Sequence, residues 1–102
     1  MEEIVKNLKE NVGNIIKIKG KKASGLWQHM QKNIETHQII NYIDIDDTYQ
    51  IIAYTQDEIK CEDKIELTGE IIELRGSKHP RSKVDESFSE YQMIVDSWKC
   101  ID

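Results

Sequence analysis

Basic side chains are concentrated in two short windows of a chain whose net charge is negative. The windows are residues 15–34 and 75–84, which together hold nine of the 14 Lys and Arg residues and no Asp or Glu. A polyanion responds to the local potential within about 8 Å, the Debye length at physiological salt, and not to the net charge of −5. The windows therefore indicate a polyanion site, provided that the fold brings them together. The residues concerned are Lys17, Lys19, Lys21, Lys22, Lys32, Arg75, Lys78, Arg81 and Lys83.

Aromatic side chains add a second kind of chemistry. Trp27 lies within the first window, and Tyr42 and Tyr54 follow that window in sequence. An aromatic ring that stacks on an unpaired base contributes about 1 to 3 kcal/mol in proteins that bind single strands. Each ring also has a purely structural interpretation, because Trp27 could cover one end of the core and the two tyrosines could pack across neighbouring strands. Both interpretations stay open at this point.

No motif for catalysis, cofactor binding or metal binding is visible. The chain contains no Ser-His-Asp arrangement, P-loop or dinucleotide fingerprint. Its three His and two Cys residues lack the CxxC or HxxxH spacing of a metal site. Asp44, Asp46 and Asp47 are expected to cap a turn or repel phosphates and not to form a two-metal site. We therefore expect a protein that is not an enzyme and holds no cofactor or metal.

Length and composition predict one small globular domain that covers residues 1–102. The chain is 38% hydrophobic and 32% charged, with 17 Ile residues and a single Pro. It has no apolar stretch of about 20 residues and no secretory signal at its N-terminus, so we expect a cytoplasmic protein without a membrane partner. In that compartment Cys61 and Cys100 are expected to be reduced thiols and not a disulfide.

The positions of apolar residues predict a mainly β fold with a short helix. Ile4, Val5 and Leu8 are spaced as on one face of a helix within residues 1–11. Alternating or β-branched segments then predict five strands, at residues 14–22, 37–45, 49–56, 64–74 and 90–101. Loops are expected at 23–36 and 75–89.

The second and third strands should form a hairpin about Asp46, Asp47 and Thr48. If Ile45 faces Tyr49 across this turn, the side chains divide into two surfaces. One surface, which carries Ile39, Ile43, Ile45, Ile51 and Ala53, is the expected core face. Tyr42 and Tyr54 then share the opposite face with polar neighbours.

Five strands in this order resemble the OB-fold, a five-stranded Greek-key barrel. The segments that carry the resemblance are NVGNIIKIKGKK, IDIDDTYQIIAYT and IKCEDKIELTGEII. They are similar to the opening strand, the hairpin and the Gly-containing fourth strand of replication protein A and of tRNA-anticodon-type OB domains. The chain departs from that pattern in its hairpin turn, which has no Gly, and in the short connection between its third and fourth strands.

The resemblance implies a barrel over residues 12–102 and a function for the basic windows. OB-folds bind oligonucleotides on the face of strands 2 and 3, between the loops that join strands 1 to 2 and 4 to 5. The first window covers strand 1 and the loop that follows it, the second window covers the loop between strands 4 and 5, and Tyr42 and Tyr54 fall on the floor between them. The expected ligand is single-stranded DNA or RNA, and the expected partners include other subunits or domains of a replication or repair complex. The alternative is an OB-fold module for protein interaction or oligomerisation.

Overall fold

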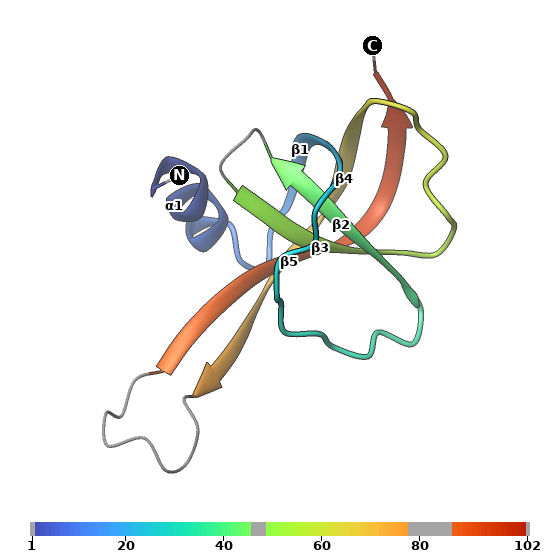
Figure 1. Cartoon of the computed structure of the whole chain (residues 1–102). Helices are drawn as coiled ribbons and strands as arrows, with labels where there is room; N and C mark the ends of the chain where they lie inside the picture. The colour runs from blue at the N-terminus through green and yellow to red at the C-terminus, as the bar shows by residue number, and fades with distance from the viewer. Residues whose placement is uncertain (1, 46–48, 78–86, 102) are drawn as a thin grey trace.

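The computed structural model describes residues 2–45, 49–77 and 87–101, which form one helix and five strands (Figure 1). The helix expected within residues 1–11 is confirmed, and the fold is mainly β as predicted. The elements are α1 (Glu2–Glu10), β1 (Ile15–Lys22), β2 (Ile39–Ile45), β3 (Tyr49–Thr55), β4 (Lys64–Ser77) and β5 (Ser87–Cys100).

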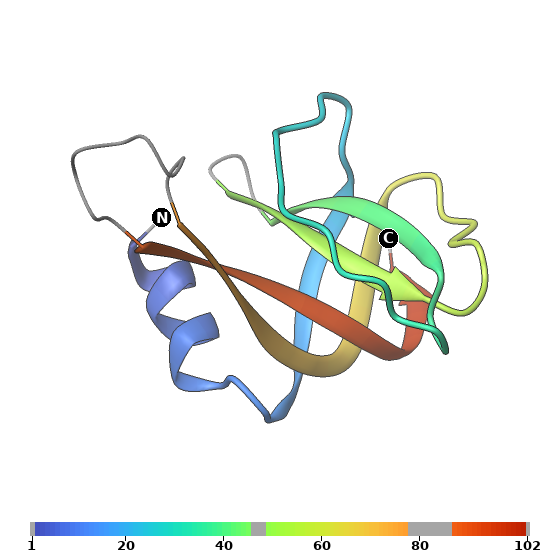
Figure 2. The same cartoon turned by 90° about the horizontal axis from the view of Figure 1, so that it is seen from below.

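The five strands form one closed sheet in the order β1-β2-β3-β5-β4 (Figures 1 and 2). β1 closes the sheet because most of its length pairs with β4, while its last residues, Lys21 and Lys22, also pair with β2. All neighbouring strands are antiparallel except β3 and β5, which are parallel.

The register of the β2–β3 hairpin is the predicted one. Ile45 pairs with Tyr49, Ile43 with Ile51, and the pairing continues without a shift to Ile39 and Thr55. Ile43, Ile51 and Ala53 consequently point into the core, where they are fully buried. The turn residues Asp46, Asp47 and Thr48 lie outside the described residues.

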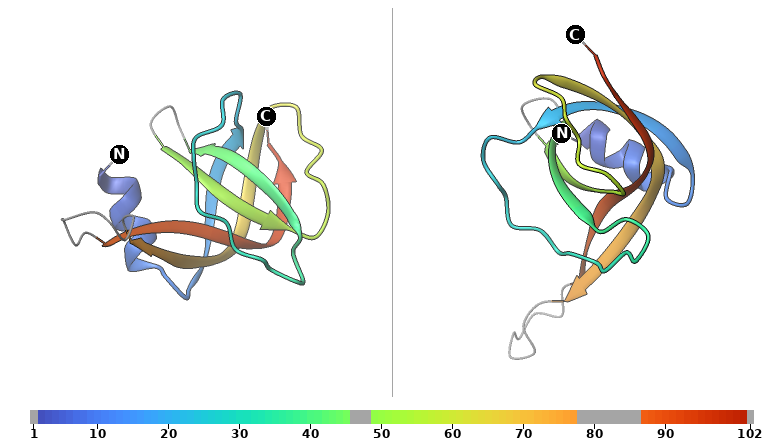
Figure 3. Two further views of the ribbon diagram at one scale, coloured as in Figure 1. Left: turned by 60° about the horizontal axis from the view of Figure 1, so that its bottom comes forward. Right: turned by 90° about the vertical axis from the view of Figure 1, so that its right-hand side faces the viewer.

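The core fills the inside of the sheet, and α1 covers one end of it. Leu8 of α1 is buried within the core cluster, and Ile4 and Val5 pack against that cluster. The helix lies beside the first half of β5 (Figures 2 and 3). The prediction that the apolar residues of this helix share one face is confirmed, because that face is buried against the strands.

The β4–β5 ribbon is longer than predicted. Pairing continues from Arg75 and Ser89 to Ser77 and Ser87, so Arg75 lies in a strand and the expected loop of residues 75–89 is shorter. The cause is the backbone ladder, which continues through Arg75–Ser77 and Ser87–Ser89, two segments too short to establish an alternation of apolar and polar residues. The register shifts at Thr68 and Gly69, where a Cβ on Gly69 would lie 2.2 Å from the carbonyl oxygen of Ile94. The close approach of β5 explains the glycine there.

Cys61 and Cys100 form a disulfide, so the expectation of reduced thiols is wrong. Their Cα atoms are 5.5 Å apart, within the usual range for a disulfide. Cys100 pairs with Ile65 at the start of β4, and Cys61 lies four residues before Ile65. The β4–β5 register therefore brings together two residues that are 39 positions apart.

As for membrane spans, the described residues include no helix with the length and apolar character to cross a bilayer.

Candidate nucleic-acid interface

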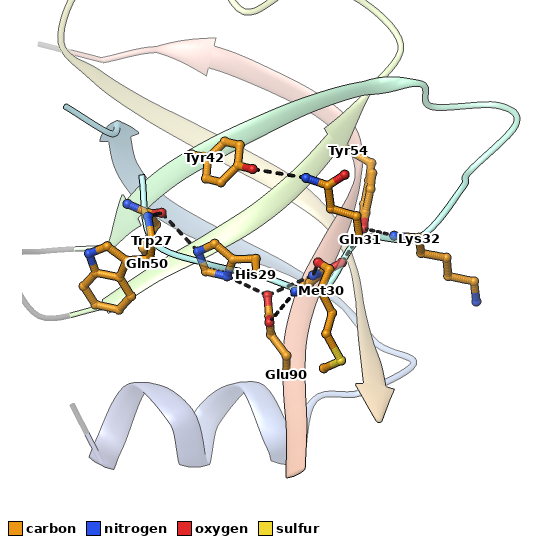
Figure 4. A network of polar contacts seen from close by, with 10 residues as sticks. Trp27, His29, Met30, Gln31, Lys32, Tyr42, Gln50, Tyr54 and Glu90 are labelled. Atoms are coloured by element: carbon orange, nitrogen blue, oxygen red, sulfur yellow. Dashed lines mark hydrogen bonds and ion pairs between the residues drawn. The ribbon is translucent and has the colours of Figure 1, made fainter. Parts of the chain in front are cut away.

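The connection between β1 and β2, residues 23–38, runs across the outer face of the sheet (Figure 3). We call this segment the strap. Part of it lies over the face formed by β3 and β5, opposite to the core face (Figure 4). Backbone groups of Gly25, Trp27, Met30 and Lys32 form hydrogen bonds with side chains of the sheet, which allows an irregular segment to lie on a buried surface.

Two residues of β3 hold the strap. The amide nitrogen of Gln50 donates to the carbonyl of Gly25 at 2.8 Å, and its amide oxygen accepts from the backbone N–H of Trp27 at 2.9 Å. The hydroxyl of Tyr54 accepts from the backbone N–H of Lys32 at 2.8 Å. These bonds fix both the beginning and the middle of the strap.

Two residues of β5 hold the middle of the strap at Met30. Glu90 accepts from the backbone N–H of Met30 at 3.0 Å, and the amide nitrogen of Gln92 donates to the Met30 carbonyl at 2.6 Å. The side chain of His29 lies between Glu90 and Gln50 (Figure 4). Strap and sheet are thus joined by a continuous polar network.

Tyr54 is fully buried by this arrangement. Its hydroxyl donates to the amide oxygen of Gln92 while it accepts from Lys32. Burial is the main cause that raises the pKa of the Tyr54 hydroxyl. The ring predicted to stack on a base therefore packs beneath the strap and anchors it.

Tyr42 and Trp27 remain accessible in part. The Tyr42 ring is half-buried, meets His29 edge-on at 5.6 Å between centroids, and its hydroxyl accepts from Gln31. Trp27 is 48% exposed, with its ring parallel to His29 and edge-on to Tyr49. Of the three predicted stacking residues, Trp27 presents the largest free surface.

Two hollows adjoin at Ile40 along the outer side of β2. One has a volume of about 460 Å³ and is lined by Lys22, Leu26 and Tyr42, among others. The other has a volume of about 270 Å³ and is lined by Lys32, Tyr54 and amide side chains of the strap. We call the two hollows together the β2 groove. A lysine lines each hollow, and Glu58 adds one carboxylate to the first.

The β1 lysines lie elsewhere. Lys17, Lys19 and Lys21 are exposed on the strand that pairs with β4, where Lys19 is opposite Glu66. Their neighbours across the sheet therefore include carboxylates that offset part of their charge. Of the five lysines in the first window, Lys22 and Lys32 line the groove.

Of the four basic residues in the second window, Arg75 lies within the described residues. Its guanidinium Nε lies 3.4 Å from a carboxylate oxygen of Glu73. The pKa of Glu73 is lowered, chiefly by a hydrogen bond from Ser89, with the charge of Arg75 acting in the same direction. Lys78, Arg81 and Lys83 lie outside the described residues. That the two windows flank one groove therefore stays a prediction.

Four residues that anchor the strap were not predicted from the sequence, namely His29, Gln50, Glu90 and Gln92. Two features of the sequence could have indicated these anchors. Gln50 lies on the same strand face as Tyr54, and Gln92 lies two residues from Glu90 in another strand. Polar residues at such positions usually indicate a solvated face, so alternation alone cannot reveal a covering segment.

Comparison of the chain with protein-family models, with curated proteins and with solved structures gives no match. Within residues 2–45, 49–77 and 87–101, no cluster of three or more His, Cys, Asp or Glu residues is arranged to hold a metal ion. We therefore infer the function from the chemistry of the groove and the strap.

Proposed function

We propose that the chain is an OB-fold domain that binds single-stranded DNA or RNA along the β2 groove. The strand order, the parallel β3–β5 contact and the closure of β1 on β4 support the OB-fold assignment. In this fold a single strand is bound by cations that contact phosphates and by rings or aliphatic side chains that contact bases.

The observation that carries the proposal is the arrangement of the groove itself. Lys22 lines one hollow and Lys32 the other, and Ile40 lies where they adjoin. Tyr42 contributes a partly accessible ring to the first hollow. Two cations on either side of an apolar and aromatic surface suit a short stretch of sugar-phosphate backbone with unpaired bases.

The strap changes which part of the OB-fold face is proposed to bind. It buries Tyr54 and Gln50 on β3, so the proposed ligand lies along β2 and the outer side of the strap. Trp27 lines neither hollow, and its exposed ring on the strap is proposed as a further stacking surface. The proposed site therefore uses the first basic window through two of its lysines and one ring.

Lys22→Glu and Lys32→Glu are each expected to weaken the binding of oligo-dT and oligo-U. Each lysine is proposed to release about one counterion, so each substitution should reduce the log-log salt slope by about 0.7 on a single strand. Fluorescence anisotropy of labelled oligonucleotides at several salt concentrations measures both quantities. Lys6→Glu on the exposed side of α1 makes the same charge change away from the groove and should have a smaller effect.

Equal effects of all three substitutions would indicate a non-specific response to net charge and would contradict the groove. If the unaltered protein binds neither oligonucleotide at about 100 µM and low salt, where phosphate contacts are strongest, the nucleic-acid proposal fails.

A second candidate function is protein interaction, which the apolar surface of the same groove favours. Leu26 is 67% exposed and Ile40 is 37% exposed, and both line the first hollow. If this surface mediates oligomerisation, sedimentation velocity should show self-association that changes little with salt, and Leu26→Ser should abolish it. A monomer at all concentrations would remove oligomerisation from consideration.

The Cys61–Cys100 disulfide bears on the compartment in which either function operates. Disulfides persist in oxidising compartments and are rare in the cytoplasm of most organisms. The cytoplasmic localisation stays a prediction, and measurement of the thiol state of Cys61 and Cys100 in cells would test it.

A further inference from the structure

His29 belongs to the strap, and its side chain connects strands β3 and β5 through Gln50 and Glu90. Its Nε2 lies 3.0 Å from the amide oxygen of Gln50, and its Nδ1 lies 2.6 Å from a carboxylate oxygen of Glu90 (Figure 4). The His29 side chain is 5% exposed and that of Glu90 is 16% exposed. The pair is therefore largely shielded from bulk water.

The orientation of Gln50 requires a proton on Nε2 of His29. The Gln50 amide nitrogen donates to the carbonyl of Gly25 and to the carboxylate of Asp44, both at 2.8 Å. The amide oxygen must then be the atom that faces the Trp27 N–H and His29. An amide oxygen only accepts hydrogen bonds, so Nε2 of His29 must be the donor.

The position of Glu90 requires a second proton. A neutral imidazole that is protonated at Nε2 would direct its Nδ1 lone pair at the Glu90 oxygen 2.6 Å away. That oxygen already accepts from Gln92 at 2.9 Å, and the other accepts from the Met30 N–H. Two electron pairs at this distance repel, so a proton must lie between the nitrogen and the oxygen. The His29–Glu90 pair is then neutral overall, whichever atom holds that proton.

We propose that this shared proton is a pH-sensitive latch that holds the strap on the sheet. When the proton is lost, the pair carries a net negative charge and a lone pair faces a carboxylate in a buried site. His29 and Glu90 then separate, which weakens the attachment of the strap at Trp27 and Met30. The latch is closed when the pair keeps its proton and opens as the pH rises and the proton leaves.

The other groups around the pair do not replace the proton. Asp44 of β2 is linked to His29 through Gln50, and the Tyr42 ring of β2 meets His29 edge-on. The pKa values of Tyr49 and Tyr54 of β3 are raised, chiefly by burial, and the charge of Glu90 acts in the same direction. These neighbours are neutral or acidic, so none of them supplies a positive charge that could take the place of the proton.

The latch does not depend on the identity of the ligand. It controls the position of Trp27 and Lys32, because both belong to the strap. If the proposed function is right, affinity for a single strand will change over the same pH range. The latch itself can be tested without any oligonucleotide.

The experiment is amide hydrogen exchange and ring ¹⁵N chemical shifts by NMR, from about pH 5 to about pH 9, the range in which His changes charge. At the low end both ring nitrogens of His29 should show shifts of hydrogen-bonded, protonated nitrogen. As the pH rises, protection factors of the Trp27 and Met30 amides, corrected for intrinsic exchange, should fall about tenfold on loss of one charge-assisted bond. Amides of Ile51 and Ala53 in the core should keep their protection.

Two variants separate the latch from general effects of pH. Glu90→Gln removes the carboxylate and should abolish the pH dependence at Trp27 and Met30. His37→Gln changes another strap histidine, which contacts Thr36, and should preserve it. The proposal is overturned if the unaltered protein shows constant protection at Trp27 and Met30, or an acceptor signature at one His29 nitrogen at the low end.

Discussion

Replacement of both Cys61 and Cys100 by Ser is expected to lower the free energy of unfolding by about 4 kcal/mol. The disulfide closes a loop between residues 39 positions apart, and its loss returns the conformational entropy of that loop to the unfolded chain. It also releases the end of β5 from the segment that precedes β4. Urea denaturation of the oxidised protein and of the double variant measures the difference.

Reduction provides the control for this prediction. Dithiothreitol should destabilise the unaltered protein by a similar amount and leave the double variant unchanged. If the double variant is as stable as the oxidised protein, the disulfide contributes nothing to the fold and carries no information about the compartment. If the loss is near the predicted value, the protein is most stable where thiols are oxidised.

Gln92→Leu is expected to destabilise the protein by about 3 kcal/mol, because a buried polar group left without a partner costs about 1 to 3 kcal/mol. Gln92 is fully buried and bonds to the Met30 carbonyl, the Tyr54 hydroxyl and Glu90. Leu preserves most of the volume but leaves the Met30 carbonyl without its side-chain donor and the Tyr54 hydroxyl proton without its acceptor. Urea denaturation gives the stability, and hydrogen exchange at Lys32 reports whether the strap is loosened.

Gln56→Leu is the matched control, because Gln56 is exposed just beyond the end of β3. A surface substitution of this kind should change stability by less than about 0.5 kcal/mol. Equal, small effects of both substitutions would mean that Gln92 does not hold the strap. A large effect of Gln92→Leu with unchanged exchange at Lys32 would place its contribution in the sheet and not in the strap.

The strap also explains why the predicted interface and the structure differ. The alternation of β2 and β3 assigned Tyr42 and Tyr54 to the face opposite the core, and their pairing with Ile52 and Ile40 agrees with that assignment. The strap, residues 23–38, covers this face, and its apolar residues follow neither the period of a helix nor that of a strand. The burial of Tyr54 therefore follows from hydrogen bonds to Lys32 and Gln92, which are 22 and 38 residues away in sequence.

The sequence by itself determined the local parts of this protein. The helix follows from the spacing of Ile4, Val5 and Leu8, and the hairpin register follows from the alternation on either side of a short turn, because both depend on residues close in the chain. Tertiary structure alone decided the Cys61–Cys100 disulfide and the His29–Glu90 pair. Each joins residues that only strand pairing and the path of the strap bring together, so no local pattern encodes them.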